Sequence, residues 1–189
     1  MQNPDAIVIG AGIVGASSAL SLSNAGLKVL VIDRGAVSSG TTGAGEGNIL
    51  VSDKDPGPEL TLALRSRDLW FEMQEDVGDS FELEAKGGVV VARHDDGPLM
   101  KLAAEQSEHG VLTQKLDHTS LHELEPYLHP EFHFGVLYTQ DAQCQPMLAA
   151  AHVIRTVIKR GGAFISQARV TRIIVENGSV AGIETTQGI

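Results

Sequence analysis

The stretch Ala6-Ile7-Val8-Ile9-Gly10-Ala11-Gly12-Ile13-Val14-Gly15 decides the fold of this chain. It opens with a short apolar run rich in β-branched side chains, which is typical of a strand buried on both faces of a parallel sheet. The glycines follow at once, and a helix-like stretch then continues to Asn24, with Gly26 where a helix end favours a left-handed residue. A second apolar run, Val29–Ile32, ends at Asp33. The sequence therefore predicts a strand–helix–strand unit.

The glycine spacing Gly10-x-Gly12-x-x-Gly15 indicates a dinucleotide site, because it follows a predicted strand and opens a predicted helix. Gly10 permits the tight turn, Gly12 lets the backbone approach a pyrophosphate, and Gly15 lets the helix pack closely on the sheet. The first turn of the helix offers unpaired N–H groups and the positive end of its dipole to phosphates. Asp33 follows Gly15 by about 18 residues, where a carboxylate can bind both ribose hydroxyls and repels a 2′-phosphate. The pattern favours FAD or NAD over NADP; the alternative is that Asp33 only caps the strand.

The segment after Asp33 helps to separate FAD from NAD. Ser38 to Asn48 reads SSGTTGAGEGN, within a longer loop of Gly, Ser, Thr and Asp that runs from Gly35 to Gly57. An NAD enzyme normally continues from its second strand into another helix of the nucleotide fold. Loops of such length are usually functional or disordered. This loop could offer hydroxyl and N–H groups to a second phosphate and a flavin ring. The loop favours FAD, and a flexible surface loop is the alternative.

The remaining chain alternates between helical and strand patterns. Periodicity, Pro and Gly positions and one N-cap residue, Asp117, set the expected bounds. Helices are expected over residues 58–75, 99–109, from 118 to about 126, and 147–159. Strands are expected over 81–92, with a break at Gly87-Gly88, and over 111–116, 134–139, 163–165, 170–176 and 180–185. A turn at Asn177-Gly178 joins the last two strands.

Composition excludes several classes of protein. The 189 residues carry 14 Lys and Arg against 24 Asp and Glu, a formal net charge of −10, which argues against nucleic acid and anionic membranes as partners. Cys144 is the single cysteine, so no internal disulfide can form. The uncharged stretch from Ala6 to Ala25 contains many serines and glycines and has no preceding basic residue, so we expect neither a signal peptide nor an integral membrane segment. These features predict a cytoplasmic protein.

Two histidine pairs have spacings that could suggest a metal site. His118-x-x-x-His122 and His129-x-x-x-His133 would each share one face of a helix, a spacing that can chelate zinc. Two prolines interrupt any continuous helix through this region, and no third ligand follows at a familiar spacing. We therefore predict no metal site.

Taken together, the motifs resemble those of the D-amino-acid oxidase-type (DAO) family of FAD-dependent oxidoreductases, which includes glycine oxidase, sarcosine oxidase and D-amino-acid dehydrogenases. The resemblance covers most of the chain. Its Gly-Glu-Gly-Asn loop also resembles the flavin subunits of hetero-oligomeric dehydrogenases that act on hydroxyproline, opines or glycine. The residues that carry the resemblance are Ile7 to Gly15, Asp33-Arg34-Gly35, Thr41 to Gly47, Gly135 to Tyr138 with Asp141 and Pro146, the segment 161–163, Ala168-Arg169-Val170-x-x-Ile173, and Val180-x-Gly182-Ile183-x-Thr185.

The resemblance implies a set of FAD-binding residues. The glycine turn would hold the pyrophosphate, Asp33 the adenosine ribose, and Arg34 would lie near the adenine. The Gly/Thr-rich loop would reach a phosphate and then pass the ribityl chain and flavin, and the Val170 backbone would meet the adenine. The full set is Gly10, Gly12, Ile13, Val14, Gly15, Asp33, Arg34, Thr41, Thr42, Ala44, Gly45, Glu46, Gly47, Asn48 and Val170.

The resemblance also implies an α/β fold: a Rossmann-like FAD-binding parallel sheet with an inserted mixed α+β substrate domain, truncated. Residues 1–55 and 136–189 would form the incomplete FAD-binding domain, and residues 56–135 the first part of the substrate domain. Family members are about twice as long, so the second half is expected either further along the gene or in a partner subunit. Catalytic residues would lie mostly in that half, and none is named here.

The activity implied is oxidation of the C–N bond of a small-molecule amine or amino-acid substrate, with a hydride passing from Cα to flavin N5 to give an imine. One alternative is a non-catalytic FAD- or nucleotide-binding fragment or subunit that needs a partner chain. A further alternative is an NAD-dependent dehydrogenase.

Overall fold

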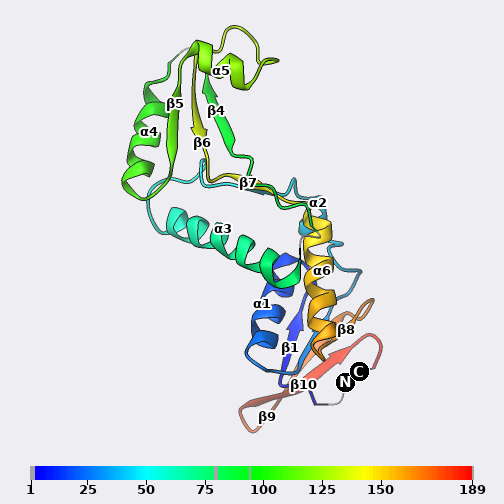
Figure 1. The fold of residues 1–189 in the computed structure, drawn as a ribbon. Coiled ribbons are helices and arrows are strands. Elements are labelled where there is room, and N and C mark those ends of the chain that lie inside the picture. Colours follow the sequence, from blue (N-terminus) through cyan, green and yellow to red (C-terminus); the bar gives the residue numbers. More distant parts are fainter. Residues whose placement is uncertain (1–2, 79–80, 94, 189) are drawn as a thin grey trace. The chain divides into compact units, whose positions relative to one another are not determined.

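The computed structural model describes residues 3–78, 81–93 and 95–188, which divide into two compact units (Figure 1). The first unit comprises the residues up to Glu46, a short segment at Phe81, and the chain from Gln145 onward. The second comprises Gly47–Gly78 and Glu82–Cys144. The predicted boundaries between the FAD-binding domain and the substrate domain lie at 55/56 and 135/136.

A parallel three-stranded sheet lies at the centre of the first unit. Its order is β1 (Ala6–Ile9), β2 (Val29–Ile32) and β8 (Ala163–Ile165), with Ala6 opposite Val29 and Leu30 opposite Ala163. Every residue of β2 is buried, as expected for an apolar run in the middle of a parallel sheet. The predicted parallel sheet and these three strands are confirmed.

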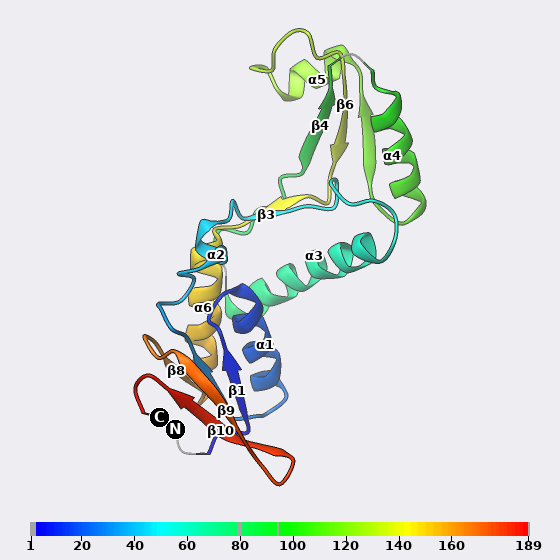
Figure 2. The same ribbon diagram turned by 180° about the vertical axis from the view of Figure 1, so that it is seen from behind.

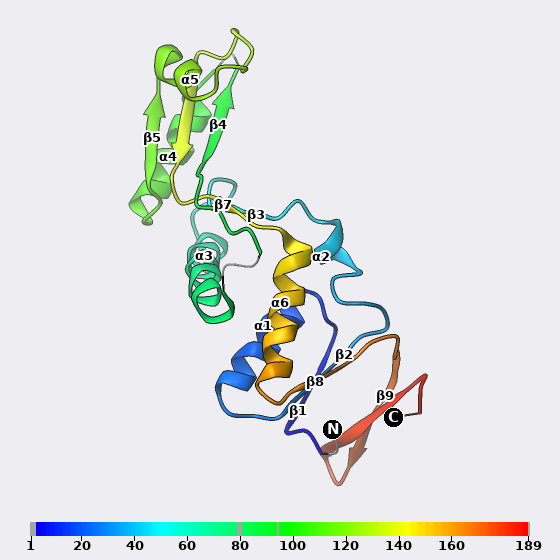
Figure 3. The same cartoon turned by 45° about the vertical axis from the view of Figure 1, so that its right-hand side comes forward.

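Two helices cover this sheet. Helix α1 (Ile13–Asn24) packs on β1 and β2, and α6 (Pro146–Lys159) packs on α1 and β8 (Figure 3). Pro146 begins α6, where its fixed φ suits the first helical position, and Gly161 ends the region with φ +91°. The apolar face of α6 is buried through Ala149, Ala150, Val153, Ile154 and Val157.

The first unit ends in a hairpin, β9 (Val170–Glu176) and β10 (Ser179–Thr185), which pair antiparallel (Figure 2). Both residues of the Asn177-Gly178 turn have positive φ, 49° and 79°, as a two-residue turn that follows the strand twist requires. The predicted hairpin is confirmed. The first residues of β9 are the part that matters for the candidate site.

The second unit contains an antiparallel sheet in the order β4 (Gly88–Ala92), β6 (Phe134–Tyr138), β5 (Thr113–Leu116). Its buried core combines residues from one strand, two helices and two connecting loops: Val51, Leu60, Ala103, Val111, Val136 and Tyr138. The helices are α3 (Pro58–Val77), α4 (Gly97–Glu108) and α5 (His118–Leu124), and a short ribbon pairs β3 (Asn48–Ile49) with β7 (Ala142–Gln143). Asp117 caps α5 as predicted, its Oδ1 accepting the Ser120 N–H at 2.9 Å.

Two expectations about local structure were wrong. The loop from Gly35 to Gly57 is not free of regular structure, because it contains α2 (Thr41–Ala44) and β3. Strand β3 depends on pairing with a segment nearly a hundred residues later, which no local pattern reveals. Only one strand, β4, forms between 81 and 92; before it, Glu84 makes an isolated bridge to Gln143.

Candidate functional site

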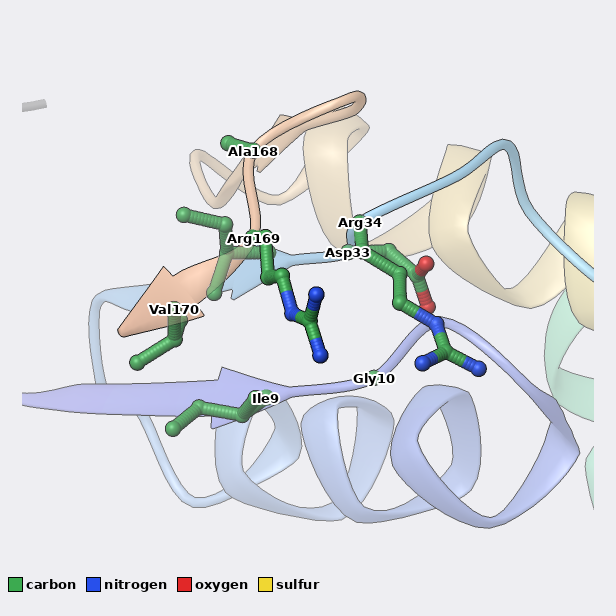
Figure 4. A pocket seen from close by; sticks show the side chains of 8 residues that line it. Ile9, Gly10, Asp33, Arg34, Ala168, Arg169 and Val170 are labelled. Atoms are coloured by element: carbon green, nitrogen blue, oxygen red, sulfur yellow. The ribbon is translucent and has the colours of Figure 1, made fainter. Parts of the chain in front are cut away.

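A pocket of about 270 Å³ opens beside the ends of β1 and β2, in the first unit (Figure 4). Three chain segments line it: the end of β1, the end of β2, and the turn that leads into β9. This is the carboxyl edge of a parallel sheet, where open α/β sheets bind ligands. The lining residues are Ile9, Gly10, Ile32, Asp33, Arg34, Ala168, Arg169 and Val170.

Asp33 connects these segments. Its Oδ2 accepts the Ala11 N–H at 2.7 Å and its Oδ1 accepts the Gly35 N–H at 2.7 Å. Its backbone carbonyl accepts the Ala168 N–H at 2.9 Å, which ties the turn before β9 to the end of β2. An ionised carboxylate has about four acceptor positions, so each oxygen retains capacity for a further donor such as a ribose hydroxyl.

The glycine turn has the geometry that close approach of a ligand requires. Gly10 has φ +113°, a conformation that side chains rarely adopt. A Cβ on Gly15 would lie 2.0 Å from the Gly10 carbonyl oxygen and 3.3 Å from Val8, so only glycine lets α1 begin this close to β1. Gly12 is the N-cap of α1 and supplies no side-chain cap, which leaves the helix N-terminus to other partners.

One such partner comes from the Gly/Thr-rich loop. The Thr42 hydroxyl accepts the Ile13 N–H at 3.0 Å, and a Cβ on Gly12 would lie 3.0 Å from the same Thr42 oxygen. The Ser38 N–H donates to the Ala11 carbonyl at 3.1 Å, while its buried hydroxyl is the side-chain polar atom that lacks a partner among the described residues. A buried orphan hydroxyl, a helix N-terminus and a glycine turn together fit a phosphate-containing cofactor.

The fifteen predicted site residues fall into four groups. Gly10, Asp33, Arg34 and Val170 meet at the pocket. Gly12, Ile13, Val14 and Gly15 form the adjoining turn, which Thr42 touches; Thr41, Ala44, Gly45 and Glu46 belong to the first unit, are exposed, and do not line the pocket. Gly47 and Asn48 belong to the second unit, where Asn48 begins β3 and the Gly47 carbonyl accepts the Cys144 N–H at 2.9 Å.

Four lining residues were not predicted from the sequence. They are Ile9, Ile32, Ala168 and Arg169. The signal for three of them was present, since Ala168 and Arg169 precede the predicted Val170 in the chain, and Ile9 directly precedes Gly10.

The histidine pairs do not form a metal centre in the part of the chain that the structure describes. The rings of His118 and His122 lie with centroids 4.5 Å apart, and His118 and His133 with centroids 5.2 Å apart, in tilted arrangements. The His122 ring contacts the Phe132 carbonyl at 3.1 Å.

Among the described residues, no helix has both the length and the apolar character needed to cross a bilayer.

A family model described as FAD dependent oxidoreductase (DAO) matches residues 5–189. The chain therefore belongs to the DAO family of FAD-dependent oxidoreductases, and the family resemblance and the FAD cofactor expected from the sequence are confirmed. The glycine turn, the Asp33 carboxylate and the orphan Ser38 hydroxyl provide a fitting place for the phosphates and ribose of that cofactor.

Two relatives illustrate the range of the family. The chain is 26% identical over 193 residues to the anaerobic glycerol-3-phosphate dehydrogenase subunit A1 of Haloferax volcanii, covering 98% of this chain and 31% of that protein. It is 27% identical over 173 residues to N-methyl-L-tryptophan oxidase of Yersinia pestis, covering 89% of this chain and 46% of that protein. The chain thus spans about a third to a half of the length of these relatives.

Solved structures agree with this assignment. Glycine oxidase from Bacillus cereus superposes with a TM-score of 0.89 at 25% identity, over 98% of this chain and 52% of that one. FAD-bound L-α-glycerophosphate oxidase from Mycoplasma pneumoniae superposes with a TM-score of 0.88 at 20% identity, over 98% and 50%, and so shares the fold.

Proposed function

We propose that this chain is the FAD-binding portion of an oxidoreductase that oxidises the C–N bond of an amino acid or a secondary amine. The observation that carries the proposal is the pocket at the end of β2, where Asp33 is fixed by two backbone N–H groups beside a glycine turn. Membership of the DAO family and likeness to N-methyl-L-tryptophan oxidase support this substrate class. A cytoplasmic location is part of the same proposal.

When bound, FAD would accept the two electrons that leave the substrate as a hydride. The chain's own residues would bind and orient the adenosine end of the cofactor. Asp33 would accept hydrogen bonds from the ribose, the turn from Gly10 to Gly15 would lie against the diphosphate, and Thr42 would meet a phosphate oxygen. Thr41, the segment Ala44 to Asn48 and the Val170 backbone complete the proposed set.

We also propose that activity depends on a second half of the enzyme, supplied by further sequence or by a partner subunit. The coverage of about half of glycine oxidase and less than half of N-methyl-L-tryptophan oxidase supports this view. The likeness to a protein named as a dehydrogenase subunit supports the partner-chain version. The same likeness makes oxidation of a carbon–oxygen bond, as in glycerol 3-phosphate, the second candidate activity.

Titration of the purified chain with FAD and with NAD tests the cofactor site. We expect FAD, and not NAD, to raise the unfolding temperature of the chain, because a ligand that binds only the folded state must stabilise it. The flavin fluorescence of FAD should also decrease on binding. D33A should weaken FAD binding, and E176A, a distant acidic residue on β9, should not. Stabilisation by NAD alone would contradict the proposal.

Activity is tested separately. The chain, alone and with the product of the adjoining reading frame, is assayed for dye reduction with glycine, sarcosine, N-methyl-L-tryptophan and glycerol 3-phosphate. Turnover of an amine only in the presence of the second chain supports the proposal. Turnover restricted to glycerol 3-phosphate would favour the second candidate.

A further inference from the structure

Part of the pocket lining is apolar and lies beside its polar residues. Ile9, at the end of β1, is 53% exposed, although the other three residues of that strand are partly buried. Val170 and the small Ala168 line the pocket with it. Asp33 provides acceptors for a sugar, so this apolar surface is left for the other part of a nucleoside, which is a flat base.

Arg169 lies at this surface, and two hydrogen bonds to Thr186 hold its main chain in place. Its N–H donates to the Thr186 hydroxyl at 3.1 Å, and its carbonyl accepts the Thr186 N–H at 2.9 Å. The preceding residue, Ala168, is anchored to the Asp33 carbonyl. The point from which the Arg169 side chain leaves the backbone is therefore fixed relative to the pocket.

The Arg169 side chain extends from the turn before β9 toward the segment that carries Gly10, and Arg34 extends toward the same segment (Figure 4). Arg169 is exposed and makes no ion pair with an acidic residue in the described ranges, whereas Arg172, three residues along β9, is paired with Glu184. The guanidinium of Arg169 is thus available to a ligand.

We propose that Arg169 recognises the adenine of the cofactor by stacking its guanidinium on the face of the purine ring, which Ile9 and Val170 contact with their apolar side chains. This inference rests on the proposed function. A guanidinium is planar and weakly hydrated, so it stacks on π systems without the desolvation that an ammonium group would require. Arg169 is then a binding residue that selects a purine base, in addition to Asp33, which selects the sugar.

Three variants of the 189-residue chain test this inference with ADP as the probe. R169Q removes the charge and the full guanidinium, R169K keeps the charge but not the plane, and R155Q removes a charge from the exposed surface of α6, away from the pocket.

ADP affinity is measured by calorimetry at low and high salt, and circular dichroism checks that each variant folds. We expect R169Q to bind ADP about 3- to 30-fold more weakly, the range that a stacked cation supplies. R169K should recover little of the loss, R155Q should bind like the original chain, and the loss should persist at high salt.

The opposite results separate the two levels of the proposal. If R169K binds ADP within twofold of the original chain, or if the R169Q defect disappears at high salt, charge alone is what matters and stacking is wrong. If the original chain binds neither ADP nor FAD, the proposed cofactor site is wrong and this inference with it. If the original chain binds ADP and R169Q binds it equally well, only the role of Arg169 is wrong.

Discussion

The hydroxyl of Tyr138 donates a hydrogen bond of 2.8 Å to Oε1 of Gln106, and both side chains are fully buried in the second unit. The Gln106 amide also donates to three carbonyls of the preceding loop, those of Val51, Ser52 and Lys54, at 3.4, 3.1 and 2.7 Å. One side chain on α4 thus hydrogen-bonds the turn from Val51 to Lys54 and a residue of strand β6 at the same time.

Replacing Gln106 with leucine should destabilise the chain strongly. Q106L keeps about the same side-chain volume but leaves the buried carbonyls without a donor, which should lower the free energy of unfolding by about 3 kcal/mol. Urea denaturation measures the change, and Q114L, at an exposed position on β5, is the control and should cost little. Y138F should cost about 1–2 kcal/mol, and the double variant should cost less than the sum, because the two residues share one hydrogen bond. Additive costs would argue against the bond.

The beginning of α1 should not accept a methyl group at Gly15. A Cβ there would lie 2.0 Å from the Gly10 carbonyl oxygen, so G15A must displace the helix from β1, with a cost of about 2–3 kcal/mol. G40A is a matched control, because a Cβ at Gly40 meets nothing within 4 Å and its φ is −104°. Equal stability of G15A and G40A in thermal denaturation would show that the turn adjusts more freely than this geometry allows.

Thr42 contributes a cap to α1 from a distant loop. T42V keeps the shape of the side chain and removes the acceptor for the Ile13 N–H, which should cost about 1 kcal/mol. T41V changes the neighbouring, exposed threonine in the same way and should be close to neutral. Hydrogen exchange gives a second measurement: the Ile13 amide should exchange faster in T42V and at an unchanged rate in T41V.

Burial raises the pKa of the Cys144 thiol from its ordinary 9.0 to about 11. A raised pKa in the folded state means that the folded chain holds the proton more tightly than the unfolded chain. The resulting stability is fully present below pH 9 and is lost as the pH rises through 11. The difference in unfolding free energy between the original chain and C144A should therefore narrow by about 2 kcal/mol between pH 8 and pH 11.

Tyr138, whose pKa burial also raises, is present in both proteins of this comparison and does not affect the difference. A constant difference across this pH range would mean that the thiol is not protected from water. Alkylation of the Cys144 thiol by iodoacetamide at pH 8 gives an independent measurement of this protection. The reaction should be slow in the folded chain and fast in urea.

Local patterns predicted the first unit well because its elements are determined by short-range chemistry. The apolar run Val29–Ile32, Pro146 at the start of α6 and the Asn177-Gly178 turn each appear where propensity places them. The candidate pocket was predicted in part. Gly10, Asp33 and Arg34 do meet there, since the strand–helix–strand motif fixes their places, and Val170, which the family resemblance implied, lines the same pocket.

Long-range pairing explains what the sequence did not reveal. Asn48 and Ile49 form a strand only because Gln143 and Ala142 lie opposite them, and neither dipeptide has a strand pattern of its own. Asn48, which was expected to pass the flavin, begins this ribbon in the second unit, a local structure that the sequence did not reveal. Similarly, Arg169 lies in one of the motifs that carry the family resemblance but was assigned no role from the sequence, and only the fold brings it to the same pocket as Asp33.

The hydrogen bonds of Asp33 have a consequence for how quickly a ligand could bind. Its carboxylate already holds the Ala11 and Gly35 amides, and its carbonyl holds Ala168, through bonds internal to the protein. The three segments are therefore preorganised, and a dinucleotide that docks here does not have to order them at its own entropic expense. Association at this pocket should be limited by encounter rather than by a conformational change.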